Sequence, residues 1–198
     1  MWYWPVRFIT IILFRLLFRL KVEGRENLPA KTNFIVVANH TSFLDPFVVG
    51  LAIPNRIYWL ALREFHAAAR TRWFMLGTNT LAAGRSSNTL VELLNQNKNV
   101  GLFPEGTRAH DGRLKEFRRG AAMLAMRTGR PIVPCAIIGA YEALPAKARF
   151  LKLFSPIKVK IGRPQYLLKE FDDVVDDVHL QEGTSRVKNN IREMIHAG

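Results

Sequence analysis

The chain has 198 residues, 48% of them hydrophobic and 11% aromatic, and carries a formal net charge of +13. This composition excludes disordered, collagen-like and repeat architectures and fits one globular domain. The charge indicates an anionic partner, either a polyanion, an anionic bilayer or a phosphorylated ligand, and does not choose among them. Cys135, the only cysteine, excludes an internal disulfide and favours a reducing compartment, and its apolar surroundings predict a buried core residue rather than a nucleophile.

The first 21 residues, MWYWPVRFITIILFRLLFRLK, are the most apolar part of the chain. Charged residues interrupt the apolar stretch, which is too short to cross a bilayer simply and lacks a secretory cleavage pattern. On a helical wheel the basic residues share one half, and the other half holds Ile9, Ile12, Leu13, Leu16, Leu17 and Leu20. We therefore expect residues 1–21 to form an interfacial membrane helix whose contacts are Trp2, Trp4, Arg7, Phe8, Ile12, Arg15, Leu16 and Arg19. The alternative is a helix that covers the domain's own core.

Residues 22–198 are expected to form the main domain. Short β-rich runs alternate there with helical periodicity, and strands are predicted over 33–39, 56–62, 79–83, 99–104, 131–138 and 157–162. Helices are predicted over 46–53, 64–76, 87–97, 117–128 and 184–196. Most of the strands are continuously apolar, as in sheets buried on both faces. The pattern predicts a single α/β domain with a largely parallel or mixed central sheet covered by helices.

Polar residues follow three of the predicted strands, in NHTSFLD, GRSSN and PEGTR. Because ligands of open α/β sheets bind beyond the carboxyl ends of strands, these loops are expected to share one rim. In the first loop His40 precedes Asp45 by five residues. Asp45 could fix the imidazole tautomer and leave the other ring nitrogen free as a base. Alternatively, Ser42 or Asp45 caps the following helix and His40 satisfies backbone groups.

The third loop, PEGTR, combines a glycine that permits a tight turn with Thr107 and Arg108, which can bind an oxyanion. An ordinary turn with exposed charge is the alternative. Glu105 would oppose a phosphate there unless it pairs with an arginine or accepts a substrate hydroxyl. Arg85 is a single cation in the second loop. No histidine pair has metal-ligand spacing, so no metal site is expected.

Together, NHTSFLD and FPEGTR resemble the glycerolipid acyltransferase family that includes the 1-acyl-glycerol-3-phosphate acyltransferases. GRLKEFRRG and IVPCAI resemble further blocks of that family, and the resemblance covers roughly residues 20–165. It implies that His40 is a general base partnered by Asp45. It assigns the glycerol-phosphate acceptor site to Arg85, Glu105, Gly106, Thr107 and Arg108, with Arg118 at a position often held by lysine. Gly84 and Ala109 depart from the family pattern, which leaves the acceptor headgroup open.

The resemblance implies transfer of an acyl group from acyl-CoA or acyl carrier protein to lysophosphatidate, with no cofactor beyond that co-substrate. An anionic membrane surface is the expected partner, and the expected location is the cytoplasmic face of a membrane, as a monotopic or peripheral protein. Another lysolipid, such as a lysophospholipid or lyso-ornithine lipid, is an alternative acceptor. A membrane lipid-binding protein without turnover is a second alternative. A nucleic-acid module would rest on charge alone, so no nucleic acid is expected as a partner.

Overall fold

The structure, a computed structural model, describes residues 3–61, 80–82, 87–145, 148, 150–168 and 176–197. Its helices are α1 (Tyr3–Phe18), the short 3₁₀ helix η1 (Arg25–Asn27), α2 (Asp45–Ala52), α5 (Ser87–Asn95), α6 (Gly120–Thr128), α7 (Ala140–Ala143) and α8 (Asp177–His196). Its strands are β1 (Lys21–Glu23), β2 (Ile35–Ala38), β3 (Ile57–Ala61), β4 (Thr80–Ala82), β5 (Asn99–Leu102), β6 (Ile132–Ile138) and β7 (Lys158–Ile161). The helix expected over 64–76 lies outside the described residues.

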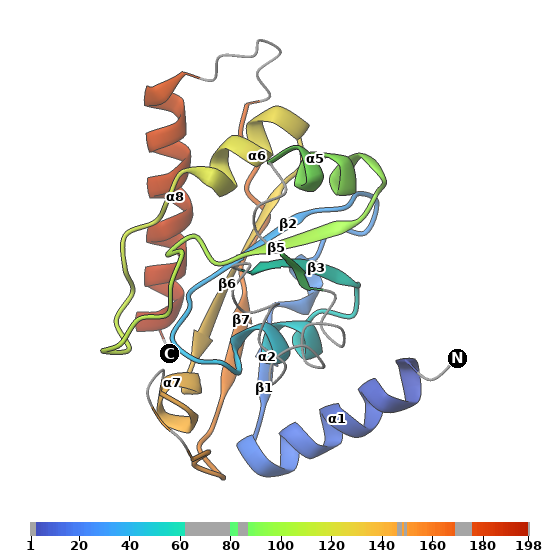
Figure 1. The fold of residues 1–198 in the computed structure, drawn as a ribbon, viewed down its shortest axis with the longest axis vertical. Helices are drawn as coiled ribbons and strands as arrows, with labels where there is room; N and C mark the ends of the chain where they lie inside the picture. Colours follow the sequence, from blue (N-terminus) through green and yellow to red (C-terminus); the bar gives the residue numbers. More distant parts are fainter. Residues whose placement is uncertain are drawn as a thin grey trace.

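Within the described residues the strands form one seven-stranded sheet in the order β1-β7-β6-β2-β5-β3-β4 (Figure 1). β7 runs antiparallel to β6, whereas the other neighbouring strands are parallel. β2 lies at the centre, between β5 and β6. The predicted α/β domain with a largely parallel or mixed sheet is confirmed.

Helices cover both faces of the sheet, which explains why the central strands are apolar throughout. In β2 the side chains of Ile35 and Val37 join the cluster formed by α5, α6 and α8. The alternate residues, Val36 and Ala38, join the cluster formed by α1 and α2. Successive residues of a strand point to opposite faces, so every position of β2 must be apolar. Cys135 of β6 is fully buried in the same core, as predicted.

Two helices, α6 and α8, begin three or more residues away from their predicted starts. α8 starts at Asp177 rather than near 184, because the side chain of Asp176 caps it by accepting a hydrogen bond from Val178 N. Because the first turns of α8 are mostly polar, the apolar periodicity used for the prediction did not reach back to this start. α6 starts at Gly120 rather than 117, since Arg118 N donates to Pro104 O at 2.9 Å and holds the preceding segment against the PEGTR loop.

The amino-terminal helix α1 packs on the core along one side and leaves apolar residues exposed on another. Ile11, Phe14 and Leu17 contact the core formed with α2, and Phe18 is fully buried. The helix ends at Phe18, so Leu20 lies beyond it and is buried. The expectation that Leu17 and Leu20 belong to the membrane face is therefore wrong, because the sheet needs both to fill its own core.

The exposed residues of α1 include several of the predicted membrane contacts. Ile12 and Leu16 are exposed together with Arg15, and Arg19 is exposed directly after the helix. Trp2 lies outside the described residues, and of Trp4, Arg7 and Phe8 the structure describes only the backbone. No helix in the described part of the chain has the length and apolar character needed to cross a membrane.

Candidate active site

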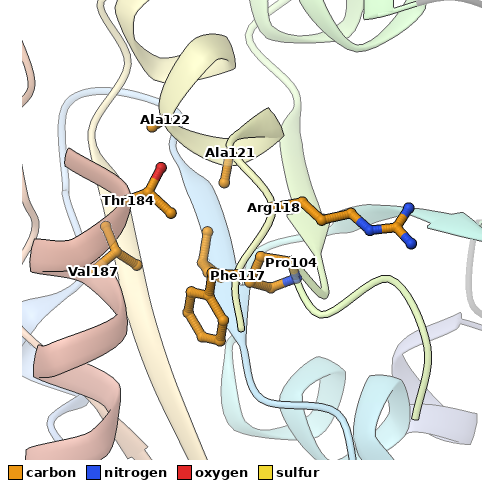
Figure 2. Close-up of a pocket in the computed structure, with 8 residues that line it drawn as sticks. Pro104, Phe117, Arg118, Ala121, Ala122, Thr184 and Val187 are labelled. Atoms are coloured by element: carbon orange, nitrogen blue, oxygen red, sulfur yellow. The ribbon is translucent and has the colours of Figure 1, made fainter. Parts of the chain in front are cut away.

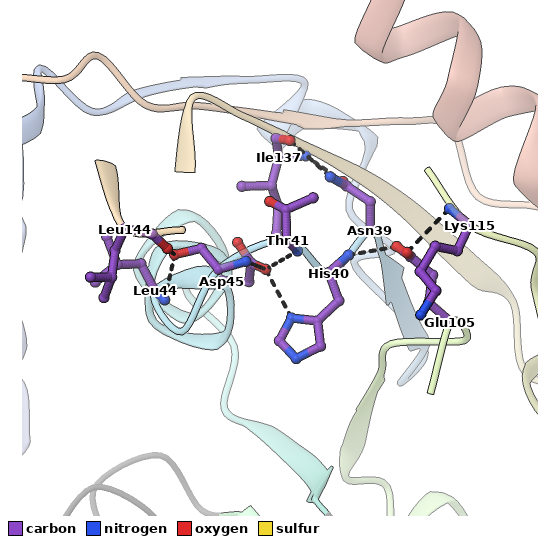
Figure 3. Close-up of polar contacts among 10 residues, drawn as sticks. Asn39, His40, Thr41, Leu44, Asp45, Glu105, Lys115, Ile137 and Leu144 are labelled. Atoms are coloured by element: carbon purple, nitrogen blue, oxygen red, sulfur yellow. Dashed lines mark hydrogen bonds and ion pairs between the residues drawn. The ribbon is translucent and has the colours of Figure 1, made fainter. Parts of the chain in front are cut away.

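The first polar loop begins where β2 ends, and Asn39 fixes its start. The Asn39 amide donates to Ile137 O at 2.9 Å and accepts from Ile137 N at 2.7 Å. These two bonds tie the end of β2 to the neighbouring strand β6 (Figure 3). Asn39 is buried, so the bonds also satisfy its polar groups. The residue after it, His40, therefore leaves the sheet at a fixed point.

His40 and Asp45 form a hydrogen-bonded pair at the start of α2. His40 Nδ1 lies 2.8 Å from Asp45 Oδ2, and the same oxygen accepts hydrogen bonds from Thr41 N at 2.7 Å and Ser42 N at 2.8 Å. Asp45 is fully buried, whereas the His40 side chain remains 20% exposed. No described group bonds to the other ring nitrogen, Nε2, so a substrate proton can reach it.

The alternative that Ser42 or Asp45 caps α2 does not hold. The N-cap of α2 is Leu44, without a side-chain capping bond, and Asp45 is the first helical residue. The Asp45 carboxylate instead points back to the loop that precedes the helix (Figure 3). Ser42 Oγ donates to Leu144 O at 2.8 Å and accepts from Leu44 N at 3.2 Å. Ser42 thus holds the loop in place and is not available as a nucleophile.

A stack of three rings supports the other side of His40. Its ring stacks on Phe103 at a centroid distance of 4.1 Å, and Phe103 stacks on Trp59 at 4.8 Å. Trp59 in turn lies over Gly101 of β5, where an added Cβ would come within 2.5 Å of the indole. Glycine is therefore required for the indole to lie against this strand. Asp45 and the ring stack together fix the position of the imidazole.

Glu105 joins the first and third loops. It is buried, and its carboxylate accepts hydrogen bonds from His40 N at 2.7 Å and from Lys115 N at 3.2 Å. Ala109 N donates to His40 O at 2.8 Å, so both backbone groups of His40 are bound to the third loop. Burial raises the pKa of Glu105 to about 7, the two backbone bonds lower it, and the charge of Asp45 raises it again. Glu105 holds the backbone of both loops and makes no ion pair with an arginine in the described part of the chain.

The third loop carries cations beside His40. Gly106 has a φ of 77°, and the guanidinium of Arg118 lies where a Cβ of residue 106 would be, with Cζ 2.7 Å from that position. Thr107 Oγ1 accepts a hydrogen bond from Lys115 Nζ at 2.8 Å. Arg108 lies with Cζ 6.0 Å from the Phe43 ring centre. Within the described residues, none of these three cations is paired with a carboxylate, so they can bind an anion.

The third loop also borders a small hollow on the other face of the sheet. The hollow has a volume of about 180 Å³, including space open to solvent, and is lined by Val37, Pro104, Phe117, Arg118, Ala121, Ala122, Thr184 and Val187. Figure 2 shows the Arg118 guanidinium pointing away from it. The Thr184 hydroxyl donates to Leu180 O. The lining therefore lacks the convergent polar groups of a ligand site, and we assign no substrate group to it.

The structure brings together most, but not all, of the residues singled out in the sequence. The first and third loops meet as expected, whereas Arg85 and the second loop lie outside the described residues. In the described part of the chain no cluster of His, Cys, Asp and Glu could hold a metal ion. The supporting roles of Asn39, Trp59 and Phe103 were missed. A signal existed only for Asn39 and Phe103, because they are the first residues of the motifs NHTSFLD and FPEGTR.

A model of the family described as "Acyltransferase" matches residues 19–138 of the chain. This range is more than half of the chain and contains the polar loops after β2 and β5.

Similar proteins carry one recurrent name. The Bacillus subtilis (strain 168) 1-acyl-sn-glycerol-3-phosphate acyltransferase is 27% identical over 182 residues, which are 88% of this chain and 87% of that protein. The chloroplastic 1-acyl-sn-glycerol-3-phosphate acyltransferase BAT2 of Brassica napus is 28% identical over 158 residues, which are 75% of this chain and 46% of that protein. The chain thus spans less than half the length of the plant relative.

A solved structure has a similar fold. The crystal structure of PlsC, the 1-acyl-sn-glycerophosphate (LPA) acyltransferase from Thermotoga maritima, aligns with a TM-score of 0.68 and 29% sequence identity. The alignment covers 88% of this chain and 71% of that chain.

Proposed function

Because the chain belongs to the acyltransferase family, we propose that it transfers a fatty acyl group from acyl-CoA or acyl carrier protein to the free hydroxyl of 1-acyl-sn-glycerol 3-phosphate. The product would be phosphatidic acid, a phospholipid precursor. The names of the Bacillus subtilis, Brassica napus and Thermotoga maritima relatives support this acceptor. The thioester is a co-substrate, and the proposed reaction needs no further cofactor.

In the proposed reaction His40 acts as the general base. Its Nε2 removes the proton of the acceptor hydroxyl while the hydroxyl oxygen attacks the thioester carbonyl carbon. The resulting tetrahedral intermediate collapses, the carbon–sulfur bond breaks, and the imidazolium returns the proton to the thiolate that leaves. Asp45 stabilises the imidazolium through the 2.8 Å bond to Nδ1. The acyl group passes directly to the acceptor, so no acyl-enzyme is formed.

In the same proposal the acceptor phosphate binds to the cations of the third loop. Arg108 directly follows the Gly106–Thr107 turn, the Arg118 guanidinium packs against Gly106, and Lys115 bonds to Thr107. Each charge-assisted hydrogen bond to a phosphate contributes about 1.5–3 kcal/mol. Arg85, which we include as a further phosphate ligand from the sequence resemblance, would add another such hydrogen bond. A lipid alcohol without a phosphate would lose this binding energy.

The remaining site residues support this geometry in the proposal. Glu105 keeps the base and the phosphate loop at a fixed separation, because its carboxylate binds the backbone of both His40 and Lys115. We further propose that the exposed apolar residues of α1 hold the site against the cytoplasmic face of an anionic membrane. A long-chain lysolipid then reaches His40 without leaving into water.

The observation that carries the proposal is the His40–Asp45 pair, with Nε2 free among the described residues and unpaired cations in the adjoining loop. The test is thiol release from long-chain acyl-CoA and from acyl carrier protein, with 1-acyl-sn-glycerol 3-phosphate in mixed micelles. Monoacylglycerol, which lacks the phosphate, is the matched control acceptor. We expect release that depends on the phosphorylated acceptor. Equal release with monoacylglycerol would contradict the phosphate site, and no release with either donor would contradict the activity.

A further inference from the structure

The segment between α7 and β7 exposes an unusual run of large apolar side chains. All five residues of 150–154 are exposed, and four of them are Phe or Leu, namely Phe150, Leu151, Leu153 and Phe154. Phe150 is 86% and Phe154 62% exposed. Single exposed apolar residues are normal on soluble domains, but a contiguous group of this size indicates an interaction site.

This segment lies beside the carboxyl-terminal end of α1. Phe154 N donates to Leu17 O at 2.6 Å, and Ile157 N donates to Phe18 O at 2.9 Å. Ile12, Leu13 and Leu16 of α1 are exposed as well. Figure 1 shows α1 and the turn before β7 at the same end of the molecule. We call these exposed residues of α1 and segment 150–154 the apolar end face.

The backbone holds Phe154 in a conformation that is costly for a bulky residue. Its φ is +65°, in the left-handed region that favours glycine. The bond to Leu17 fixes the residue in this state, and Lys152 N is fixed by Ala143 O at 2.8 Å. A glycine or asparagine would adopt such an exposed turn at lower cost. An exposed aromatic side chain at this costly backbone position points to a role outside the core.

Positive charge surrounds the apolar end face. Residues 1–22 contain four basic residues and residues 144–160 contain five, and neither segment contains an acid. Of these, Arg15, Arg19 and Lys152 are exposed. Of the acids close to the face, Glu23 of β1 pairs with Lys158 at 3.5 Å, and Glu142 of α7 is exposed next to Ala143, whose carbonyl binds Lys152 N. Apolar side chains flanked by cations are the combination that binds an anionic bilayer surface.

We propose that the apolar end face docks on a bilayer containing anionic lipid, with segment 150–154 inserting beside α1 as a second membrane contact. This deepens the proposed membrane association of α1 and rests on it. The face also connects to the site, because Ser42 bonds to Leu144 O and pairs with Pro145, five residues before Phe150. The bilayer surface would then adjoin the His40 loop, where a lysolipid acceptor must arrive.

Site-specific labelling tests the proposal in the full chain. Cys135 is fully buried, and burial raises its pKa to about 12, so a thiol dye should label only an introduced cysteine. The variants are Phe150→Cys, Leu16→Cys on α1, and Leu168→Cys as a control that is 75% exposed outside the face. Each carries an environment-sensitive dye and is mixed with vesicles of equal parts phosphatidylcholine and phosphatidylglycerol. We expect a blue shift at 150 and 16 and none at 168.

A shift at 16 without one at 150, or no vesicle binding at all, would overturn the proposal. Phe150→Ser combined with Leu153→Ser should weaken vesicle binding about tenfold or more, whereas Leu168→Ser should not. A dimer in sedimentation that this double substitution dissociates would instead assign the face to a second copy. Thiol release with short-chain, water-soluble substrates should stay unchanged in the double variant, which separates failure of docking from failure of the proposed activity.

Discussion

Replacing Asp45 by asparagine removes one charge from the proposed site and leaves its shape. Asp45 Oδ2 accepts three hydrogen bonds, from His40 Nδ1 and from the backbone of Thr41 and Ser42. The asparagine oxygen can accept all three. Its amide nitrogen would take the place of Oδ1, which is buried and has no partner among the described residues. We therefore expect the Asp45→Asn chain to fold, at a cost of about 1–3 kcal/mol for the unpaired amide.

The expected catalytic loss follows from the charge. Asp45 faces a positive imidazole only after His40 has taken the acceptor proton, so the attraction stabilises the transition state and not the bound substrate. Two unit charges about 4 Å apart attract by about 4 kcal/mol at the effective dielectric of a partly exposed site. Part of this remains as a neutral hydrogen bond, so we expect kcat to fall about 10²- to 10³-fold. The KM for the acceptor should change little.

The assay is steady-state thiol release at saturating acyl donor, with the acceptor concentration varied. Asp177→Asn, which removes an exposed carboxylate paired with Arg119 at 2.9 Å, is the matched control. Circular dichroism and thermal unfolding should show that both variants are folded. A folded Asp45→Asn enzyme that keeps more than about one tenth of kcat would refute the role assigned to the carboxylate.

Three further substitutions test the third loop. Glu105 binds its proton more tightly in the folded chain than in the unfolded chain, because its pKa rises from 4.5 to about 7 on folding. Raising the pH from about 4.5 to about 7 should therefore lower the free energy of unfolding by up to about 3 kcal/mol, with no further loss at higher pH. Denaturant unfolding should show this loss in the wild-type chain and not in Glu105→Gln, and parallel pH profiles of the two chains would contradict it. Gly106→Ala should cost about 1–2 kcal/mol of stability because of its φ of 77°, and should displace Arg118, raising the acceptor KM; an unchanged melting temperature would count against this strain. Arg108→Gln should raise KM about 10- to 100-fold for lysophosphatidate and not for monoacylglycerol; an equal effect on both acceptors would place the phosphate elsewhere.

The central strands of the sheet could be predicted because burial on both faces leaves a clear pattern. β2 and β6 are apolar at every position, and their short length and β-branched residues favour strands over buried helix segments. β1 could not be found in the same way. It is three residues long and lies at the sheet edge, where only Val22 is half-buried. Its place depends on pairing with β7, which is more than a hundred residues away.

The site could be predicted only where its residues stand close together in the sequence. His40 and Asp45 stand in one short motif, where the spacing left their contact open and the resemblance implied it. The binding of Glu105 to the backbone of His40 could not be predicted, because it depends on how two parallel strands place their following loops. α1 shows the same limit: it is apolar on several sides, and only the fold decides that Phe14 and Leu17 meet the core while Leu16 stays exposed.

The measurement that tests the central claim most directly is acceptor-dependent thiol release by a folded His40→Ala variant. The control is His196→Ala, which removes an exposed histidine at the end of α8. Loss of the general base should reduce kcat about 10²- to 10⁴-fold in a chain that is still folded by circular dichroism, with vesicle binding unchanged. Undiminished release by His40→Ala with lysophosphatidate and acyl-CoA or acyl carrier protein would contradict the mechanism proposed for this loop.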